Sequence, residues 1–311
     1  MKSPIELIAL LATLMIAALP LVGAASQSAA SPTELVGPYF GQTPPGDKPV
    51  IFAPGIVSKG NVHGRLVISP DGRDLFWTAF EPPASQGIVR VMHVTRTANG
   101  WSAPQIAPFA TAGNTAEPLF SPDGKKLIFA SRQNGSMSLQ YVEKTDSGWS
   151  APKSGGFLPN PTSSFTQSGK VYYSDALKGK SWNRGIYVAD YTGSGYANPQ
   201  ALPTNINSRG IDYTPFIAPD ESFLMFCSSR PSRGENMYLY ISFRGADGSW
   251  STPEKMNEKL GFNGKARFPS LSPDGKYLFF CGDDGNIYWV KAEVLAKFRP
   301  AISASIAPNA R

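Results

Sequence analysis

The sequence predicts an all-β protein, a five-bladed β-propeller closed by its own N-terminal strand. Three observations predict it: one hairpin phrase recurs five times, each repeat continues with further short strands, and one strand is left over near the N-terminus. Repeats of this size that are built from short strands are typical of propellers.

The recurring phrase is an apolar strand, then Ser-Pro-Asp-Gly or a variant of it, then a second apolar strand. Asp-Gly between two apolar runs predicts a hairpin because glycine tolerates a positive φ, and the preceding proline ends the first strand. Successive copies are 52, 45, 52 and 54 residues apart. They are anchored at Ser69, Ser121, Thr166, Ala218 and Ser272.

Each repeat continues with a third strand of alternating aromatic and aliphatic residues, and a Gly-aromatic-Ser-x-Pro phrase, as at 100–104, opens a fourth. The last repeat lacks this phrase and runs into a short helix at 292–297. The unassigned strand at 49–54 resembles a fourth strand, so we expect it to pair with 287–290 and close the ring. Six blades are the alternative if 39–56 forms more than one strand.

The N-terminus has the pattern of a secretory signal peptide: a positive start, an apolar run at 7–19 and small residues at 22–25. We expect a signal peptide at 1–25, a disordered linker at 26–38, the propeller at 39–296 and a disordered tail at 297–311. Export to the periplasm or the extracellular space follows, with no transmembrane segment after cleavage. An uncleaved membrane anchor is the alternative.

Composition narrows the range of partners. Hydrophobic residues make up 41% of the chain, which supports a large core, and the formal net charge is +6. The basic residues are dispersed, so we expect no nucleic-acid partner and favour attraction to anionic envelope glycans. The two cysteines, Cys227 and Cys281, hold equivalent places in different repeats, which predicts reduced thiols.

The repeats resemble the TolB-type, WD-repeat-like β-propeller repeat, whose hallmark is Ser-Pro-Asp-Gly-x-x-Leu-x-Phe, over about 39–296. Phrases such as 39–46, 54–58 and 215–222 also resemble an exported bacterial subfamily without an assigned function. The resemblance implies a propeller. It leaves activity open, because propellers include enzymes, lectins and scaffolds.

The topology places all Asp-Gly turns on one face, where their aspartates serve the hairpins. The opposite face collects the starts of the inner strands and the second–third loops, and ligands of propellers commonly bind at such a mouth. Arginine forks suit carboxylate or phosphate groups. The predicted ligand-binding residues are His63, Arg65, Glu117, Arg132, Asp212, Tyr213, Arg230, Arg267 and Phe268.

Catalytic motifs are scarce. The chain has two histidines, so we expect no metal site, and no P-loop, dinucleotide fingerprint or Gly-x-Ser-x-Gly elbow occurs, so we expect no cofactor. The His-rich metal site of the similar oligogalacturonate lyases is missing. We expect His93 to be packed or hydrogen-bonded within its strand.

Three functions stay open. The first is a non-enzymatic, monomeric propeller that binds an envelope protein or an anionic glycan. The second is a carbohydrate-active enzyme, a hydrolase or lyase, that uses Glu117 and Asp212 across the channel. The third is a TolB-like envelope scaffold, which would carry an exposed apolar patch on its flank.

Overall fold

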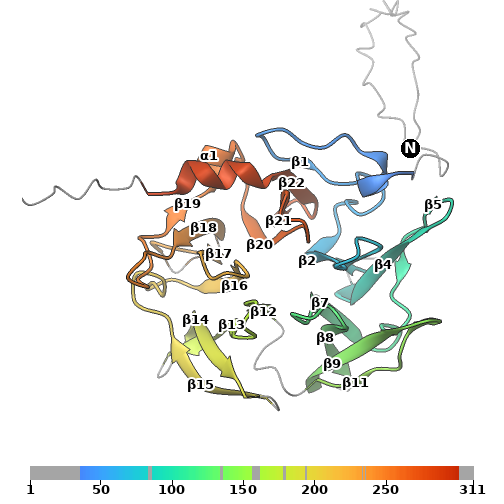
Figure 1. The fold of residues 1–311 in the computed structure, drawn as a ribbon, viewed down its shortest axis with the longest axis horizontal. Helices are drawn as coiled ribbons and strands as arrows, with labels where there is room; N and C mark the ends of the chain where they lie inside the picture. The colour runs from blue at the N-terminus through green and yellow to red at the C-terminus, as the bar shows by residue number, and fades with distance from the viewer. Residues whose placement is uncertain are drawn as a thin grey trace, which may run out of the picture.

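Five small antiparallel sheets surround a common axis (Figure 1), so the chain is a five-bladed β-propeller, as the repeats predict. The computed structural model describes residues 36–82, 86–133, 136–155, 162–177, 180–192, 195–232, 234 and 236–300. The predicted signal peptide and most of the predicted linker and tail lie outside these residues.

Each blade is an antiparallel meander of four strands, the fourth divided into two in blades 1 and 2, and its first strand lies nearest the axis in Figure 1. Blade 1 holds β2 (Val62–Ile68), β3 (Asp74–Phe80), β4 (Val89–Thr97), β5 (Gly100–Trp101) and β6 (Gln105–Ile106). Blade 2 holds β7 (Asn114–Phe120), β8 (Lys126–Gln133), β9 (Ser136–Thr145), β10 (Gly148–Trp149) and β11 (Lys153–Ser154). Blade 3 holds β12 (Ser163–Phe165), β13 (Val171–Leu177), β14 (Lys180–Tyr191) and β15 (Tyr196–Ala201).

Blade 4 holds β16 (Asp212–Ile217), β17 (Phe223–Ser228), β18 (Tyr238–Phe243) and β19 (Glu254–Lys255). Blade 5 holds β20 (Ala266–Leu271), β21 (Tyr277–Gly282), β22 (Ile287–Lys291) and, as its outer strand, β1 (Val50–Ile51). Three short helical segments complete the described chain: η2 (Pro38–Gly41), α1 (Asn257–Leu260) and η4 (Ala292–Phe298).

The ring closes as predicted. Strand β1 pairs antiparallel with β22, with Val50 opposite Trp289 and Ile51 opposite Tyr288. The next residue, Phe52, is fully buried, and its ring centroid lies 5.1 Å from those of both Phe279 and Trp289. The first and last parts of the propeller therefore share one sheet and one core.

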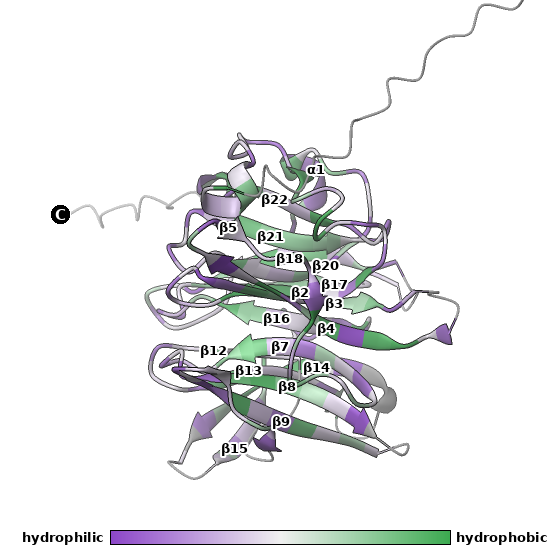
Figure 2. Cartoon of the chain, turned by 90° about the vertical axis from the view of Figure 1, so that its right-hand side faces the viewer, coloured by the Kyte–Doolittle hydropathy of each residue, from purple (hydrophilic) through white to green (hydrophobic). Residues whose placement is uncertain are grey.

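The core lies between the blades. Among the described residues, five hydrophobic clusters form, one at each junction of neighbouring blades. In the junction of blades 1 and 2, Phe76 of β3 and Phe129 of β8 are both fully buried. Figure 2, a side view of the ring, shows hydrophobic residues along the strands of the blades. Apolar burial between the sheets, which favours folding at roughly 25 cal/mol per Å², therefore holds the ring together.

The aspartates of the Ser-Pro-Asp-Gly turns form hydrogen bonds within their hairpins, as predicted. Ser121 donates a 2.6 Å hydrogen bond to Asp123, which also accepts from the backbone N–H of Lys125 at 3.1 Å. The Ser121 and Lys125 hydrogen bonds lower the pKa of Asp123. Gly124 follows with φ +69°, in the left-handed region that favours glycine. These aspartates therefore stabilise the turns.

The fourth strand differs from the expected continuous strand in blades 1 and 2. It is split there into β5 and β6, and into β10 and β11. Pro104 and Pro152 lie at the interruptions. Proline has no N–H to donate to the ladder, so the outer strand leaves the sheet at that point and rejoins it afterwards.

The C-terminal helix and the two cysteines were also predicted from the sequence. The helix predicted at 292–297 is a 3-10 helix that extends to Phe298, which is buried. Cys227 and Cys281 are buried free thiols, as predicted. Within the described residues, no helix has the length and hydropathy needed to cross a bilayer.

Candidate functional site

The innermost strands break register at the same place in four blades. The breaks lie between Val62 and Leu66, Ala116 and Leu119, Tyr213 and Phe216, and Arg267 and Ser270. Glu117, Thr214 and Phe268 have φ of +54°, +49° and +57° there, a strained conformation for non-glycine residues. Bulges re-aim side chains, and such strain gathers at functional positions.

Arg65 occupies the corresponding position in blade 1, four residues before Ser69, as Glu117 is four before Ser121. Its side chain is 2% exposed. Nη1 donates to the carbonyl of Ser163 at 2.6 Å and Nη2 to that of Pro215 at 3.3 Å. These acceptors belong to β12 and β16, so the guanidinium spans the channel from blade 1 to blades 3 and 4. Burial lowers the pKa of Arg65, and the charge of Glu117 opposes that shift.

Glu117 is held by groups of blade 1. Its backbone N–H donates to Thr78 Oγ1 at 3.0 Å. A Cβ at Gly64 would lie 3.0 Å from Glu117 Oε1 and 2.8 Å from Thr78 Oγ1, so only glycine leaves room for this carboxylate. Burial raises the pKa of Glu117 to about 7, although the charges of Arg65 and Arg267 oppose the shift.

We expect Glu117→Gln to gain stability relative to the wild type as the pH rises. The folded-state pKa of about 7 exceeds the ordinary value of 4.5, so the fold disfavours the ionised carboxylate. This cost is absent below about pH 4.5 and complete above about pH 7. Urea unfolding at pH 5 and pH 8 should show a relative gain of roughly 2 kcal/mol, discounted for partial exposure. A pH-independent difference would contradict the assignment.

Aromatic and cationic side chains surround this pair. Tyr213 is partly buried, makes an edge contact with Phe268 at 6.3 Å and lies under Arg184 at 5.7 Å. Phe268 is buried and Arg267 is partly buried. Burial raises the pKa of Tyr213, with the Glu117 charge as the next cause. The structure therefore brings Arg65, Glu117, Tyr213, Arg267 and Phe268 into one cluster, which we call the channel cluster.

Two of the predicted ligand-binding residues, His63 and Arg132, are exposed and do not belong to the channel cluster. His63 is exposed, with its ring 4.6 Å from that of Phe80, and desolvation and the Arg267 charge lower its pKa. Arg132 is exposed at the end of β8. Both can contact a ligand only at the surface.

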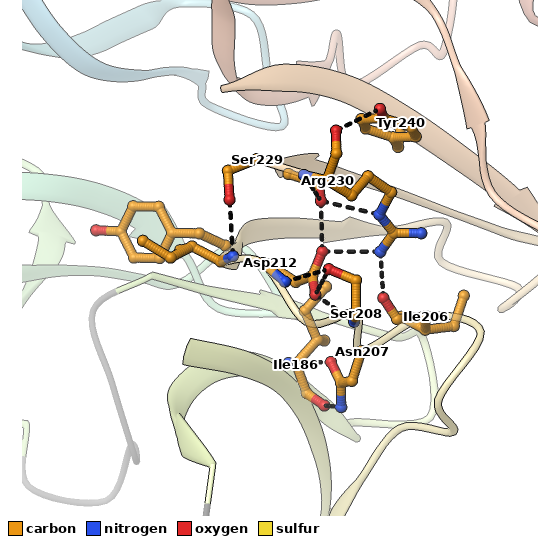
Figure 3. Close-up of polar contacts among 12 residues, drawn as sticks. Ile186, Ile206, Asn207, Ser208, Asp212, Ser229, Arg230 and Tyr240 are labelled. Atoms are coloured by element: carbon orange, nitrogen blue, oxygen red, sulfur yellow. Dashed lines mark hydrogen bonds and ion pairs between the residues drawn. The ribbon is translucent and has the colours of Figure 1, made fainter. Parts of the chain in front are cut away.

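Asp212 and Arg230 form a separate network at the end of blade 4 (Figure 3). Asp212 is fully buried and accepts hydrogen bonds from Ser208 N at 2.6 Å, Ser208 Oγ at 2.9 Å and Ser228 Oγ at 2.6 Å. Arg230 Nη2 completes the set at 2.7 Å and also donates to the carbonyl of Ile206. The Arg230 guanidinium lies over the rings of Phe226 and Tyr240, at 5.0 Å from each. Both charged groups are already satisfied by the protein.

His93 and Cys227, which could in principle act in catalysis, contact other side chains of the fold. His93 Nε2 lies 2.9 Å from Asp74 Oδ1 and the ring stacks on Phe76, so the expectation of a packed, hydrogen-bonded histidine is confirmed. Cys227 Sγ lies 3.0 Å from Thr214 Oγ1. No group of three or more His, Cys, Asp or Glu residues in the described ranges could hold a metal ion.

Sequence reasoning missed the residues that hold the bulges. Thr78 accepts from Glu117 N, and Ser174 of β13 likewise accepts from Thr214 N at 3.1 Å. In both cases a small residue of the second strand supports the bulge of the next blade. The recurrence of small residues at one offset in the second strands, including Thr78, Cys227 and Cys281, was the available signal.

No model of a known protein family matches this chain, and no curated protein is similar to it. Several solved structures are similar to it. A TolB candidate from Agrobacterium tumefaciens is 19% identical, with 72% of this chain and 71% of that chain covered and a TM-score of 0.46. TolB from Acinetobacter baumannii is 16% identical over 72% of this chain and about half, 53%, of its own, with a TM-score of 0.42.

A third similar structure is an enzyme. The α-L-arabinofuranosidase from Podospora anserina, solved with cellotriose, is 12% identical, with 76% of this chain and 92% of that chain covered and a TM-score of 0.47. At this level of similarity these structures carry no argument about activity.

Proposed function

We propose that the protein is an exported, non-enzymatic propeller that binds an anionic group of an envelope protein or glycan at its Arg-lined channel mouth. The observation that carries the proposal is the buried guanidinium of Arg65, whose Nε lacks a hydrogen-bond partner, within a cluster that also holds Arg267. Two arginines against the single carboxyl of Glu117 favour an acidic ligand, and an arginine fork matches a carboxylate.

The enzyme alternative has one favourable observation, because a glutamate with a pKa of about 7 suits a general acid. Its second carboxylate is the difficulty, since Asp212 accepts four hydrogen bonds and pairs with Arg230. The scaffold alternative calls for an apolar flank. The exposed large hydrophobic residues of the described chain, Val36, Val50 and Met137, lie on separate segments.

Binding of two carboxylate probes tests the proposal. We expect tri-galacturonate or a capped tetraglutamate peptide to bind at pH 6 by titration calorimetry, and neutral galactotriose not to bind. Whichever probe binds identifies the ligand source as glycan or peptide. Arg267→Ala should weaken binding roughly 10- to 100-fold, the range for a lost charge-assisted hydrogen bond.

The matched control is Arg73→Ala, an exposed arginine next to the Asp-Gly turn of blade 1, on the other face. It should bind like the wild type. Equal binding by Arg267→Ala, or release of reducing ends from the glycan by the wild type but not by Glu117→Gln, would argue against a non-enzymatic mouth site.

A further inference from the structure

The channel cluster contains two buried polar atoms without a partner. Arg65 Nε and Glu117 Oε2 are two of the four buried, unpartnered side-chain atoms among the described residues. Leaving such a group unsatisfied costs about 1–3 kcal/mol. One is a cationic donor and the other is a carboxyl oxygen, and the two charges act on each other. A group that accepts hydrogen bonds from a guanidinium and from a protonated carboxyl is chemically complementary to both.

The surroundings of Glu117 come from several strands. Arg65 of β2 and Arg267 of β20 act on its charge, and Glu117 in turn acts on Tyr213 of β16 and Cys281 of β21. Burial raises the pKa of Tyr213, and it raises that of Cys281 to about 12, so both are neutral near pH 7. The charged members are therefore two arginines and one carboxyl.

The protonation state of Glu117 decides what this cluster can accept. When the carboxyl is ionised, it repels an incoming anion and neutralises one of the two guanidinium charges. When it is protonated, both positive charges are available and its O–H becomes a donor. An acid–carboxylate hydrogen bond is short and strong, because its acceptor is ionised.

We propose that the channel cluster takes up a ligand carboxylate together with one proton, which resides on Glu117. The Glu117 O–H donates to the ligand carboxylate, while Arg65 Nε and Arg267 compensate its charge. The proton comes from solvent, and no covalent bond changes. This inference rests on the proposed function, since it specifies how the same mouth is regulated.

Linkage then fixes the pH dependence. The Glu117 pKa of about 7 means that the proton is already present well below pH 7 and must be taken up above it. Affinity should therefore fall roughly tenfold between pH 6 and pH 8. The pKa of His63 lies below its ordinary 6.5, so this ring is neutral at pH 7 to 8 and does not produce the trend there. Sugar and peptide carboxylates stay ionised throughout this range.

The experiment titrates the protein with tri-galacturonate and with capped tetraglutamate at pH 6, 7 and 8. For the wild type we expect the roughly tenfold loss of affinity, and uptake of about one proton per ligand at pH 8. Proton uptake is measured by comparing the binding heat in triethanolamine and Tris, two amine buffers with different heats of ionisation and no anionic group of their own, which needs no variant. Glu117→Gln should bind with a Kd that does not change between pH 6 and 8.

A matched control is Glu258→Gln, whose carboxylate on α1 is 85% exposed and should leave the wild-type pH profile intact. Binding that is independent of pH and of buffer in the wild type would overturn the proton-uptake inference and leave the proposed function standing. No binding of either probe at any pH would overturn the proposed function, and this inference with it.

Discussion

Phe52→Ala is expected to lower the free energy of unfolding by about 3–5 kcal/mol, the range for a large aromatic residue removed from a packed core. Phe52 is fully buried and contacts the rings of Phe40, Phe279 and Trp289. It follows directly after β1, the strand that closes the ring. Loss of its side chain therefore weakens both the core and the closure, and urea unfolding followed by tryptophan fluorescence measures the effect.

Val50→Ala is the control, because Val50 lies in the same strand with 42% of its surface exposed. We expect a change of less than about 0.5 kcal/mol, as for most surface substitutions. If Phe52→Ala were no more destabilising than Val50→Ala, the N-terminal strand would add little to the stability of the ring. The packing between neighbouring blades would then stabilise the ring without a contribution from the N-terminal strand.

The closure could be predicted because it follows from local patterns. Each repeat carries its own hairpin signal, so the repeats account for every expected strand except the one near Ile51. The last repeat lacks a fourth strand, and the strand near Ile51 was therefore assigned to that place. The split outer strands were missed, because the proline at Pro104 or Pro152 acts on the ladder only once the register with the third strand is known.

The sequence predicted the face on which the residues of the channel cluster lie, but not the contacts between them. The predicted topology placed Arg65, Glu117 and Phe268 on one face, at the starts of the inner strands, and the structure brings them together. The bulge that turns them inward, and the contact of Arg65 with the carbonyls of Ser163 and Pro215, depend on how blades far apart in the chain are placed. No local pattern encodes such contacts.

Arg230 and Asp212 were predicted as ligand-binding residues, and the structure pairs them with each other. Their loop positions suggested ligand-binding groups, but Arg230 folds back over Phe226 and Tyr240 onto Asp212. A residue that lies 18 positions away in sequence satisfies each charge. An arginine in a loop is available to a ligand only if the fold leaves it unpaired, and this pairing is set by the packing of blade 4.

Asp212→Ala is expected to destabilise the protein by about 3–4 kcal/mol. Removing one partner of a buried ion pair leaves the other charge uncompensated, and Arg230 here is only 15% exposed. Ser208 and Ser228 also lose their acceptor. Chemical denaturation measures the loss, and Glu254→Ala, which breaks the more exposed pair with Lys259, should cost less than about 1 kcal/mol.

The double variant Asp212→Ala/Arg230→Met separates the structural role from a catalytic one. If the aspartate only neutralises the guanidinium, removing both charges should restore much of the stability, since apolar replacements of a buried pair are often tolerated. Carboxylate binding at the channel mouth should then match the wild type. If the double variant recovered its stability but lost binding or any turnover of a glycan, Asp212 would belong to the functional site. That result would support the alternative of an enzyme that uses Glu117 and Asp212 across the channel.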